Sequence, residues 1–160
     1  MDSRFSPSKV EEGLWFGGAP STEQDYIYLK HLGVTHIIVL QPREESMLTC
    51  LRPEVSFAIS SSLGMVETRL PIEDLNPKDL RAKIKEYASY LVDLRARGAS
   101  CFVHCAYGIN RSPTLVAAYL AISRGLAPKE ACALVQEVSP SSKPDEEAVR
   151  VATSGRSPRI

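Results

Sequence analysis

The 160-residue sequence has no long apolar run and no excess of either charge. Its longest apolar segments, residues 37–40 and 115–122, are too short for a membrane span, which needs about 20 residues. The amino terminus carries no basic region followed by an apolar stretch, so we expect no secretory signal and no membrane anchor. Lysine plus arginine equals aspartate plus glutamate at 19 each, which argues against a nucleic-acid partner held by bulk charge.

The sequence has few cysteines, and they are scattered along it. The four cysteines, Cys50, Cys101, Cys105 and Cys132, fit neither zinc-type spacing nor a dense disulfide framework. We therefore expect reduced thiols and a location in the cytoplasm or nucleus. No internal repeat or low-complexity segment is visible, and the length suits one domain with a single sizeable core.

Apolar periodicity and turn residues predict alternating strands and helices. Strands are expected at residues 13–17, 34–40, 55–59, 65–70 and 101–105. Helices are expected at residues 21–31, 47–51, 77–97, 111–124, 127–137 and 145–152. For the first helix, Ser21 is the expected cap and Gln24 completes a capping box.

The alternation predicts an α/β fold with a central, mostly parallel, twisted sheet of about five strands flanked by helices. We expect a flexible N-terminal segment at residues 1–12, a single folded domain at residues 13–152 and a C-terminal tail at residues 153–160.

One segment carries recognisable chemistry: a cysteine ends a predicted strand, five residues follow, and an arginine opens a predicted helix. Such a strand-to-helix loop points backbone N–H groups into one concavity, which with the helix dipole favours an anion of phosphate size. Arg111 offers a planar fork for two phosphate oxygens, and Gly108 permits a tight turn. The same positive surroundings stabilise a thiolate at Cys105.

A cysteine and an arginine at this spacing are a weak signal alone. Here a histidine precedes the cysteine, a serine follows the arginine, and no other cysteine has an arginine six residues later. The competing interpretation is a buried structural cysteine with an incidental arginine.

Residues 104–112, followed by Pro113-Thr114-Leu115, resemble the signature of the dual-specificity branch of the protein tyrosine phosphatase superfamily. The likeness is closest to the small, atypical members and extends over most of the chain. It implies that family's fold, a phosphocysteine intermediate, and no metal or other cofactor. It also implies roles for individual residues: Cys105 is the nucleophile, Ser112 hydrogen-bonds the departing thiolate and His104 is buried behind the loop. The phosphate-binding residues would be Ala106, Tyr107, Gly108, Ile109, Asn110 and Arg111, called below the phosphate loop.

The family also needs a general acid about thirty residues before the cysteine, and Asp74 fits. Its task is to protonate the leaving oxygen and then take a proton from the attacking water. Glu73 and Asp79 are rivals. Glu73 would point to the opposite side if the preceding strand persists, and Asp79 lies at a helix start, where a carboxylate is favoured by the helix dipole. His31 and His36 have no partners at motif spacing and are interpreted as structural or surface residues.

The resemblance implies a phosphorylated protein as partner, with phosphotyrosine, phosphoserine and phosphothreonine as substrates, and we expect a monomer. Asn110 is shared with relatives that hydrolyse RNA 5′-phosphates, so an RNA 5′-phosphatase stays open, as does a lipid or glucan phosphatase on the same fold. The absence of lysine in the phosphate loop disfavours a polyphosphorylated lipid headgroup.

A non-enzymatic alternative is a phosphate-binding pseudophosphatase or scaffold, although Cys105, Arg111 and Asp74 are all retained. Cys50 is a candidate redox partner for Cys105.

Overall fold

A computed structural model of the chain describes residues 5–49 and 51–155. Its five strands form one sheet in the order β1-β2-β5-β3-β4. β1 pairs antiparallel with β2, whereas the pairs β2–β5, β5–β3 and β3–β4 are parallel. The strands are β1 Ser8–Glu11, β2 Leu14–Gly17, β3 His36–Val39, β4 Val66–Arg69 and β5 Cys101–His104. The predicted α/β fold with a mostly parallel sheet is confirmed, and the edge strand β1 makes the sheet mixed.

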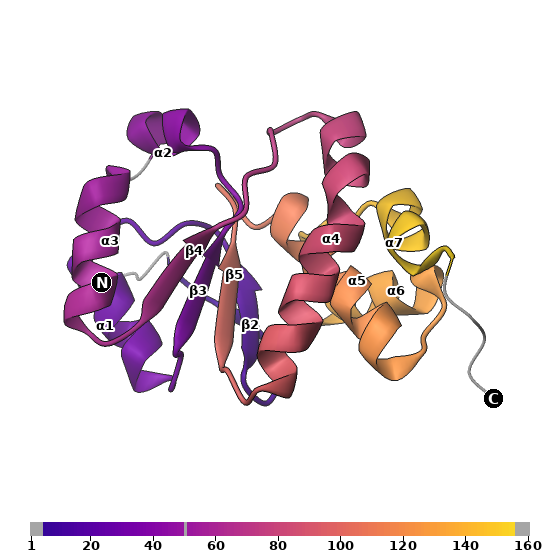
Figure 1. Cartoon of the computed structure of the whole chain (residues 1–160), viewed down its shortest axis with the longest axis horizontal. Helices are drawn as coiled ribbons and strands as arrows, with labels where there is room; N and C mark the ends of the chain where they lie inside the picture. Colours follow the sequence, from indigo (N-terminus) through magenta and orange to yellow (C-terminus); the bar gives the residue numbers. More distant parts are fainter. Residues whose placement is uncertain (1–4, 50, 156–160) are drawn as a thin grey trace.

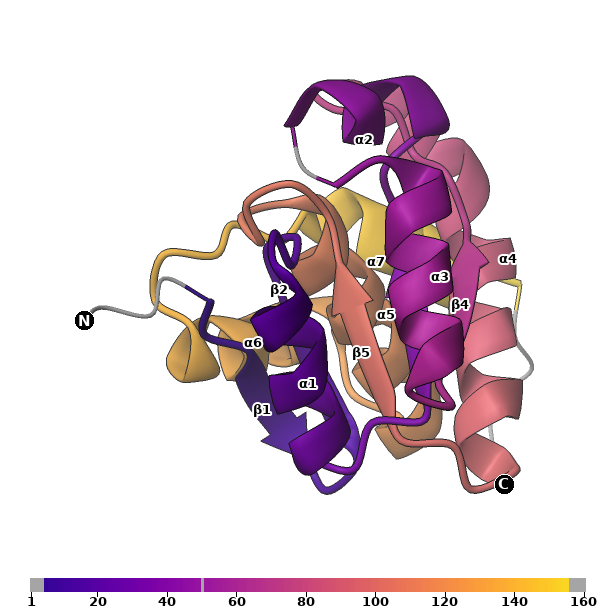
Figure 2. The same ribbon diagram turned by 90° about the vertical axis from the view of Figure 1, so that its left-hand side faces the viewer.

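Helices cover both faces of this sheet (Figure 1). On one face lie α1 Glu23–His31 and α3 Pro53–Ser62. On the other face lie α4 Pro77–Ala96, α5 Arg111–Arg124, α6 Pro128–Val138 and α7 Glu146–Thr153. The short helix α2 Arg43–Thr49 sits beyond the end of the sheet toward which β5 runs (Figure 2).

The core consists of two apolar clusters, one on each side of the sheet. β5 lies between β2 and β3, and all four of its residues are buried, as expected for a parallel strand covered on both faces. In α4, the buried residues are the ones at helical spacing in the sequence: Leu80, Ile84, Tyr87, Ala88, Leu91 and Leu94. Helix α5 is buried without a break from Arg111 to Ala121, so the element that follows the phosphate loop is anchored in the core.

The predicted strand at residues 55–59 is wrong, because these residues belong to helix α3. Val55, Phe57 and Ile59 alternate with smaller residues, which imitates the two-residue period of a strand. The buried positions of the helix are instead Pro53, Ser56 and Ser60. Since two of these are serines that hydrogen-bond Glu67, the helical period is hidden from a search for apolar residues.

Three smaller expectations also need correction. Residues 8–11 are not a flexible segment, because they form β1, and Val10 packs against the core. Polar side chains are normal on an edge strand, and they concealed it. The cap of α1 is Thr22 with Asp25, one residue later than expected. The short helix expected at residues 47–51 begins earlier, at Arg43.

None of the helices in the described part of the chain is long and apolar enough to cross a membrane. Residue 50, the candidate redox partner, lies outside the described residues, as do residues 156–160 of the expected tail.

Candidate active site

The sequence-predicted site lies at the end of β5, where the chain turns into α5 (Figure 2). Cys105 is only 2% exposed. Its sulfur accepts a hydrogen bond from the backbone N–H of Ser112 at 3.4 Å and lies 3.4 Å from the Ser112 hydroxyl oxygen. That hydroxyl donates to the carbonyl of Gly17 at 3.1 Å, and the N–H of Cys105 reaches the same carbonyl at 3.3 Å. The structure thus brings Cys105 and Ser112 together, as the sequence predicted.

The start of α5 has no side-chain cap. Asn110 occupies the cap position, but its amide nitrogen donates to the carbonyl of Lys143 at 3.0 Å. Pro113, the third residue of the helix, has no N–H to satisfy. No capping oxygen therefore competes for the first N–H groups of the helix, and that of Ser112 donates to the Cys105 sulfur, an arrangement that suits an anion.

The back of the phosphate loop packs against the end of β2. Gly108 has a φ of +73°, and a Cβ added to it would lie 2.7 Å from the carbonyl carbon of Gly17. The N–H of Ala19 donates to the carbonyl of Ala106 at 3.1 Å. This close approach of two backbones explains the glycine at position 108 on steric grounds as well as conformational ones.

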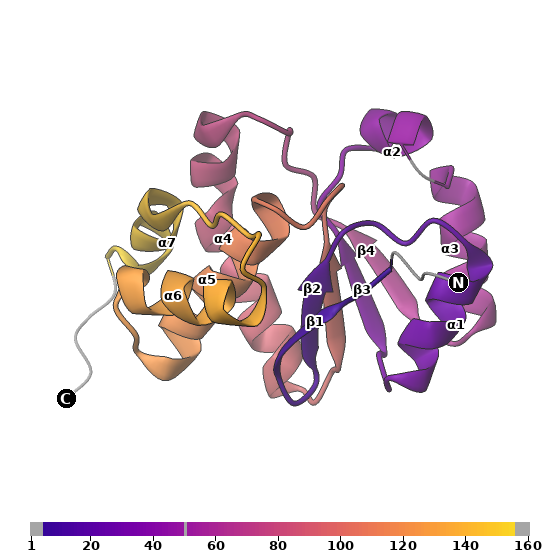
Figure 3. The same ribbon diagram turned by 180° about the vertical axis from the view of Figure 1, so that it is seen from behind.

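The loop between α6 and α7 supports the other side of the phosphate loop (Figure 3). The N–H of Lys143 donates to the carbonyl of Ile109 at 2.5 Å, while its own carbonyl accepts from Asn110. Thr114 ties the same region together, since its hydroxyl donates to the carbonyl of Asn110 and accepts from the N–H of Asp145. The phosphate loop is therefore fixed by backbone contacts on both sides.

Arg111 is buried, with 2% of its side chain exposed, and Glu45 of α2 holds it. Nη1 and Nη2 donate to the two carboxylate oxygens of Glu45 at 2.9 Å and 2.7 Å, and Nη1 also reaches the carbonyl of Ile72 at 2.9 Å. Burial is the largest single effect on Arg111 and works to lower its pKa. The hydrogen bond to Glu45 and the negative charges of Cys105, Glu45 and Asp74 together outweigh it, so the pKa is raised. Burial likewise works to raise the pKa of Glu45, and its hydrogen bonds with Arg111 and Gln41 hold it below the usual value.

Asp74 reaches the same guanidinium. Its Oδ1 lies 3.4 Å from Nη2 of Arg111, and its side chain is 43% exposed. The rival Asp79 instead accepts hydrogen bonds from the N–H of Glu73 and from Lys83, which together hold the pKa of Asp79 below its usual value. Glu73 accepts from the side chain of Asn76. Since β4 ends at Arg69, no strand extends to position 73, and the expected opposite orientation of Glu73 loses its basis.

His104 is buried directly behind the phosphate loop, as expected. Its Nδ1 lies 3.3 Å from the carbonyl oxygen of Cys105, and its ring stacks on Phe102. Burial lowers the pKa of His104 to about 4, so the ring is neutral at physiological pH. The other described cysteines, Cys101 and Cys132, are also buried, and burial raises the pKa of each to about 11.

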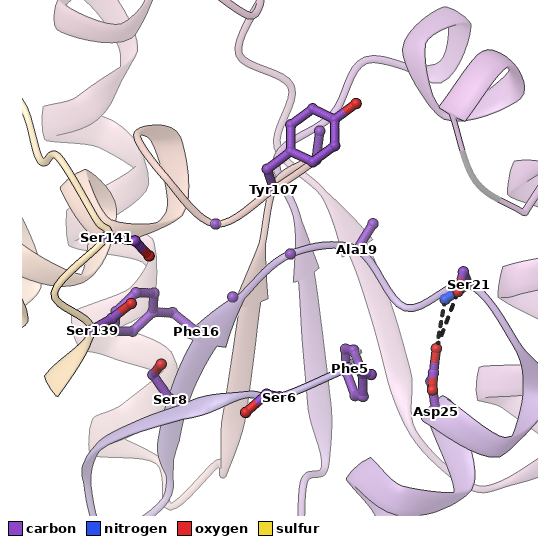
Figure 4. Close-up of a pocket in the computed structure, with 14 residues that line it drawn as sticks. Phe5, Ser6, Ser8, Phe16, Ala19, Ser21, Asp25, Tyr107, Ser139 and Ser141 are labelled. Carbon is purple, nitrogen blue, oxygen red and sulfur yellow. Dashed lines mark hydrogen bonds between the residues drawn. The ribbon is translucent and has the colours of Figure 1, made fainter. Parts of the chain in front are cut away.

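A cavity of about 300 Å³ borders the back of the phosphate loop (Figure 4). Neither Cys105 nor Arg111 lines it. Ala106, Tyr107 and Gly108 form one wall, and serines from the N-terminal segment and the α6–α7 loop form others. The ring of Tyr107 points away from the strands (Figure 4). This cavity is thus separate from the thiol and the guanidinium.

Sequence reasoning missed three contributors: Glu45, the Gly17-Gly18 pair and Lys143. Glu45 follows the strand 36–39, whose carboxyl end must lie at the same sheet edge as Cys105, so its position was a usable signal. Two adjacent glycines directly after a strand also indicate a close backbone approach. Lys143 acts through its backbone, and no residue type could have revealed that.

Comparisons with known proteins agree with this geometry. The family model "Dual specificity phosphatase, catalytic domain" matches residues 14–151. Dual specificity protein phosphatase PHS1 of Arabidopsis thaliana is 26% identical over 145 residues, covering 91% of this chain and 14% of that protein. Dual specificity protein phosphatase 22 of Homo sapiens is 30% identical over 113 residues, covering 71% of this chain and 53% of that protein. This chain therefore spans about half, or less, of these two relatives.

Two solved structures share the fold. PTPMT1 matches with a TM-score of 0.73 at 20% identity, covering 92% of this chain and 91% of that one. DUSP15 matches with a TM-score of 0.69 at 24% identity, covering 91% and 84%. The matched family model spans most of the sequence and includes both Asp74 and the phosphate loop. The chain belongs to the dual specificity phosphatase family, of which it contains the catalytic domain.

Proposed function

We propose that this chain hydrolyses phosphate monoesters of proteins, with Cys105 as the nucleophile. One observation carries the proposal: the Cys105 sulfur accepts a hydrogen bond from the first turn of α5, and Arg111 of the same turn lies 3.4 Å from Asp74. A nucleophile, an anion clamp and a carboxyl group that can exchange a proton are the parts that a phosphocysteine mechanism needs.

In the first step the thiolate of Cys105 attacks phosphorus, an S–P bond forms and the bond to the leaving oxygen breaks. Asp74 gives its proton to that oxygen, while Arg111 and the N–H groups of the phosphate loop stabilise the charge on the equatorial oxygens. In the second step water attacks phosphorus, its proton passes to the Asp74 carboxylate, and the S–P bond breaks to release phosphate and the thiolate.

Ser112 assists this second departure. Its N–H already donates to the sulfur, whereas its hydroxyl hydrogen is directed to the carbonyl of Gly17. A thiolate has no proton to donate to that hydroxyl, so the hydroxyl can rotate and donate to the sulfur instead. Protein substrates are favoured over polyphosphorylated headgroups, because the phosphate loop between Cys105 and Arg111 carries no lysine or second arginine. We further propose that the domain acts as a monomer in the cytoplasm or nucleus.

Hydrolysis of para-nitrophenyl phosphate in excess EDTA tests the proposal. We expect turnover without added metal, inhibition by vanadate, and a loss of several orders of magnitude in Cys105→Ser, because a serine hydroxyl there has no base to ionise it. Cys132→Ser is the matched control and should retain activity, since Cys132 is buried outside the site. Phosphate or vanadate binding by wild-type protein without any turnover would indicate a pseudophosphatase.

A further inference from the structure

Leu75, the residue after the proposed acid, has two properties that folding does not account for. It is the one residue other than glycine in the described ranges 5–49 and 51–155 that has a positive φ, at 58°. Its side chain is also 92% exposed. A left-handed backbone is unfavourable for leucine. Because the side chain is exposed, burial of apolar surface does not offset this cost in free energy. Backbone strain of this kind is found mainly at functional sites.

The turn that contains Leu75 is fixed by side-chain hydrogen bonds. Oδ1 of Asp74 accepts from the N–H of Leu75 at 3.0 Å and also lies 3.4 Å from Arg111. On the other side, Asn76 accepts from the N–H of Asp79 at 3.1 Å and donates to Glu73 at 3.0 Å. The carboxylate of Asp74, which lies beside the guanidinium, therefore also holds the backbone of Leu75 in this turn.

The phosphate loop also exposes apolar side chains. Tyr107 is 74% exposed and Ile109 is 43% exposed, although Cys105 and Arg111 on either side of them in sequence are almost completely buried. Because Asp74 contacts Arg111, the loop that carries Leu75 and the phosphate loop meet at the guanidinium. Two loops that meet at the Arg111 guanidinium therefore both carry exposed apolar side chains. We call Leu75, Tyr107 and Ile109 the apolar rim.

The charges beside the rim favour a peptide over a membrane as the ligand. Glu73 and Asp74 precede Leu75 directly, and residues 106–110 contain no cation. The exposed Lys143, whose backbone bonds Ile109, is a single cation beside the rim and not a cluster. An anionic lipid surface attracts clusters of lysine and arginine and is repelled by carboxylates. A phosphorylated peptide with an apolar neighbour needs only the phosphate site and an apolar contact.

We propose that the apolar rim binds a large apolar side chain next to the phosphorylated residue of a peptide substrate, so that Leu75 determines sequence specificity. This proposal rests on the phosphatase function proposed above. It identifies the preferred substrates as phosphopeptides with leucine, phenylalanine or a similar residue beside the phosphoresidue.

Two phosphopeptides that differ only in leucine or serine beside the phosphoresidue provide the test. For wild-type protein we expect kcat/KM to be about tenfold higher for the leucine peptide, equivalent to about 1.4 kcal/mol. Leu75→Asn should bring that ratio close to one, mainly through KM, because asparagine tolerates a positive φ but offers no apolar surface. Each rate is divided by the same variant's rate on para-nitrophenyl phosphate, which has no neighbouring residue. Leu75→Gly, which relieves the strain, should lose the preference equally.

Val66→Thr is the matched control, since Val66 is 52% exposed but lies at the start of β4, far along the strand from Asp74. It should keep the tenfold ratio. A leucine-to-serine ratio of kcat/KM near one for wild-type protein would overturn the proposal. An unchanged tenfold ratio in Leu75→Asn would overturn it as well. So would Leu75-dependent binding to vesicles of phosphatidylcholine and phosphatidylserine with no peptide preference, which would make the rim a lipid-binding surface.

A second readout separates this proposal from the proposed function. The affinity of Cys105→Ser for the two fluorescent phosphopeptides does not depend on turnover, and it should show the same preference for leucine. If wild-type protein fails to hydrolyse para-nitrophenyl phosphate, the phosphatase function fails while this binding measurement still tests the rim.

Discussion

Asp74 contacts Arg111 directly, whereas the two rival acids bind other partners. Asp79 accepts hydrogen bonds from the N–H of Glu73 and from Lys83, which lower its pKa and disfavour the protonated form that a general acid needs. Glu73 is bound to Asn76. At the scale of single residues, hydrogen-bond partners therefore favour Asp74 among three neighbouring carboxylates that the sequence alone left open.

This assignment predicts a dependence on the leaving group. Asp74→Ala should reduce hydrolysis of a phosphoserine peptide by about 100-fold or more, because an alkoxide leaves poorly without a proton. The same change should affect an activated aryl phosphate much less, since its phenolate needs no protonation. Rates for the two substrate types, measured side by side, check the prediction.

Glu73→Gln and Asp79→Asn serve as the controls for Asp74→Ala. Neither should alter the ratio of the alkyl to the aryl rate, although Asp79→Asn should destabilise the start of α4. A changed ratio in either control, with a normal ratio in Asp74→Ala, would show that the acid is misassigned.

Gly108 illustrates how a single residue holds two elements together. It needs both a positive φ and the absence of a Cβ, because that atom would lie 2.7 Å from Gly17 and 2.8 Å from Gly18. We expect Gly108→Ala to lower the free energy of unfolding by several kcal/mol and to abolish turnover, since one of the two backbones must move. Denaturant unfolding and para-nitrophenyl phosphate hydrolysis measure the two effects.

Gly125→Ala is a matched control because Gly125 has a φ of +67° and no atom within 4 Å of an added Cβ. It should cost only the left-handed strain of about 1–2 kcal/mol and leave turnover intact. Equal effects of the two substitutions would mean that the contact between the phosphate loop and β2 is unimportant.

At the scale of elements, α2 contributes to the site although it lies in a polar stretch. The carboxylate of Glu45 binds Arg111 through two hydrogen bonds and fixes the direction of the guanidinium. Glu45→Gln should reduce kcat/KM by about tenfold or more, because at least one charge-assisted hydrogen bond is lost. Inhibition by vanadate should weaken in parallel, since both ligands depend on the orientation of Arg111.

Glu44→Gln on the same helix is the control, because Glu44 is exposed. Its kinetics should match the wild type. An unaltered vanadate affinity in Glu45→Gln, together with reduced stability, would make Glu45 a purely structural residue.

At the scale of the whole molecule, the sequence correctly predicted the helices and strands in which apolar side chains recur at regular spacing. Helix α4 and its six buried residues agree with the prediction, as do α5 and the central strands. Helix α3 was missed because its buried face carries serines, and β1 because an edge strand needs few apolar residues. The residues proposed for the site could be selected from their types and spacing in the sequence. The residues that hold the site in place could not be predicted, since Gly17 and Lys143 act through backbone atoms, which every residue possesses.

The burial of His104 links the site to the stability of the whole fold. Burial lowers its pKa from 6.5 to about 4, and its Nε2 has no hydrogen-bond partner among the described residues. Above pH 6.5 the ring is neutral in both the folded and the unfolded chain. Between pH 6.5 and 4 only the unfolded chain takes up the proton, so stability is lost as the pH falls through this window.

We therefore expect this one group to lower the free energy of unfolding by about 2 kcal/mol between pH 7 and pH 5. His104→Phe removes the titration while keeping a ring that can stack on Phe102, so its stability should fall less over the same interval. Urea unfolding at both pH values measures the difference. His31→Phe is the control, because His31 is at the end of α1 and exposed, and it should retain the full wild-type loss. If His104→Phe loses as much stability as the wild type, His104 does not stay neutral in the folded protein, and the ring behind the phosphate loop carries a charge.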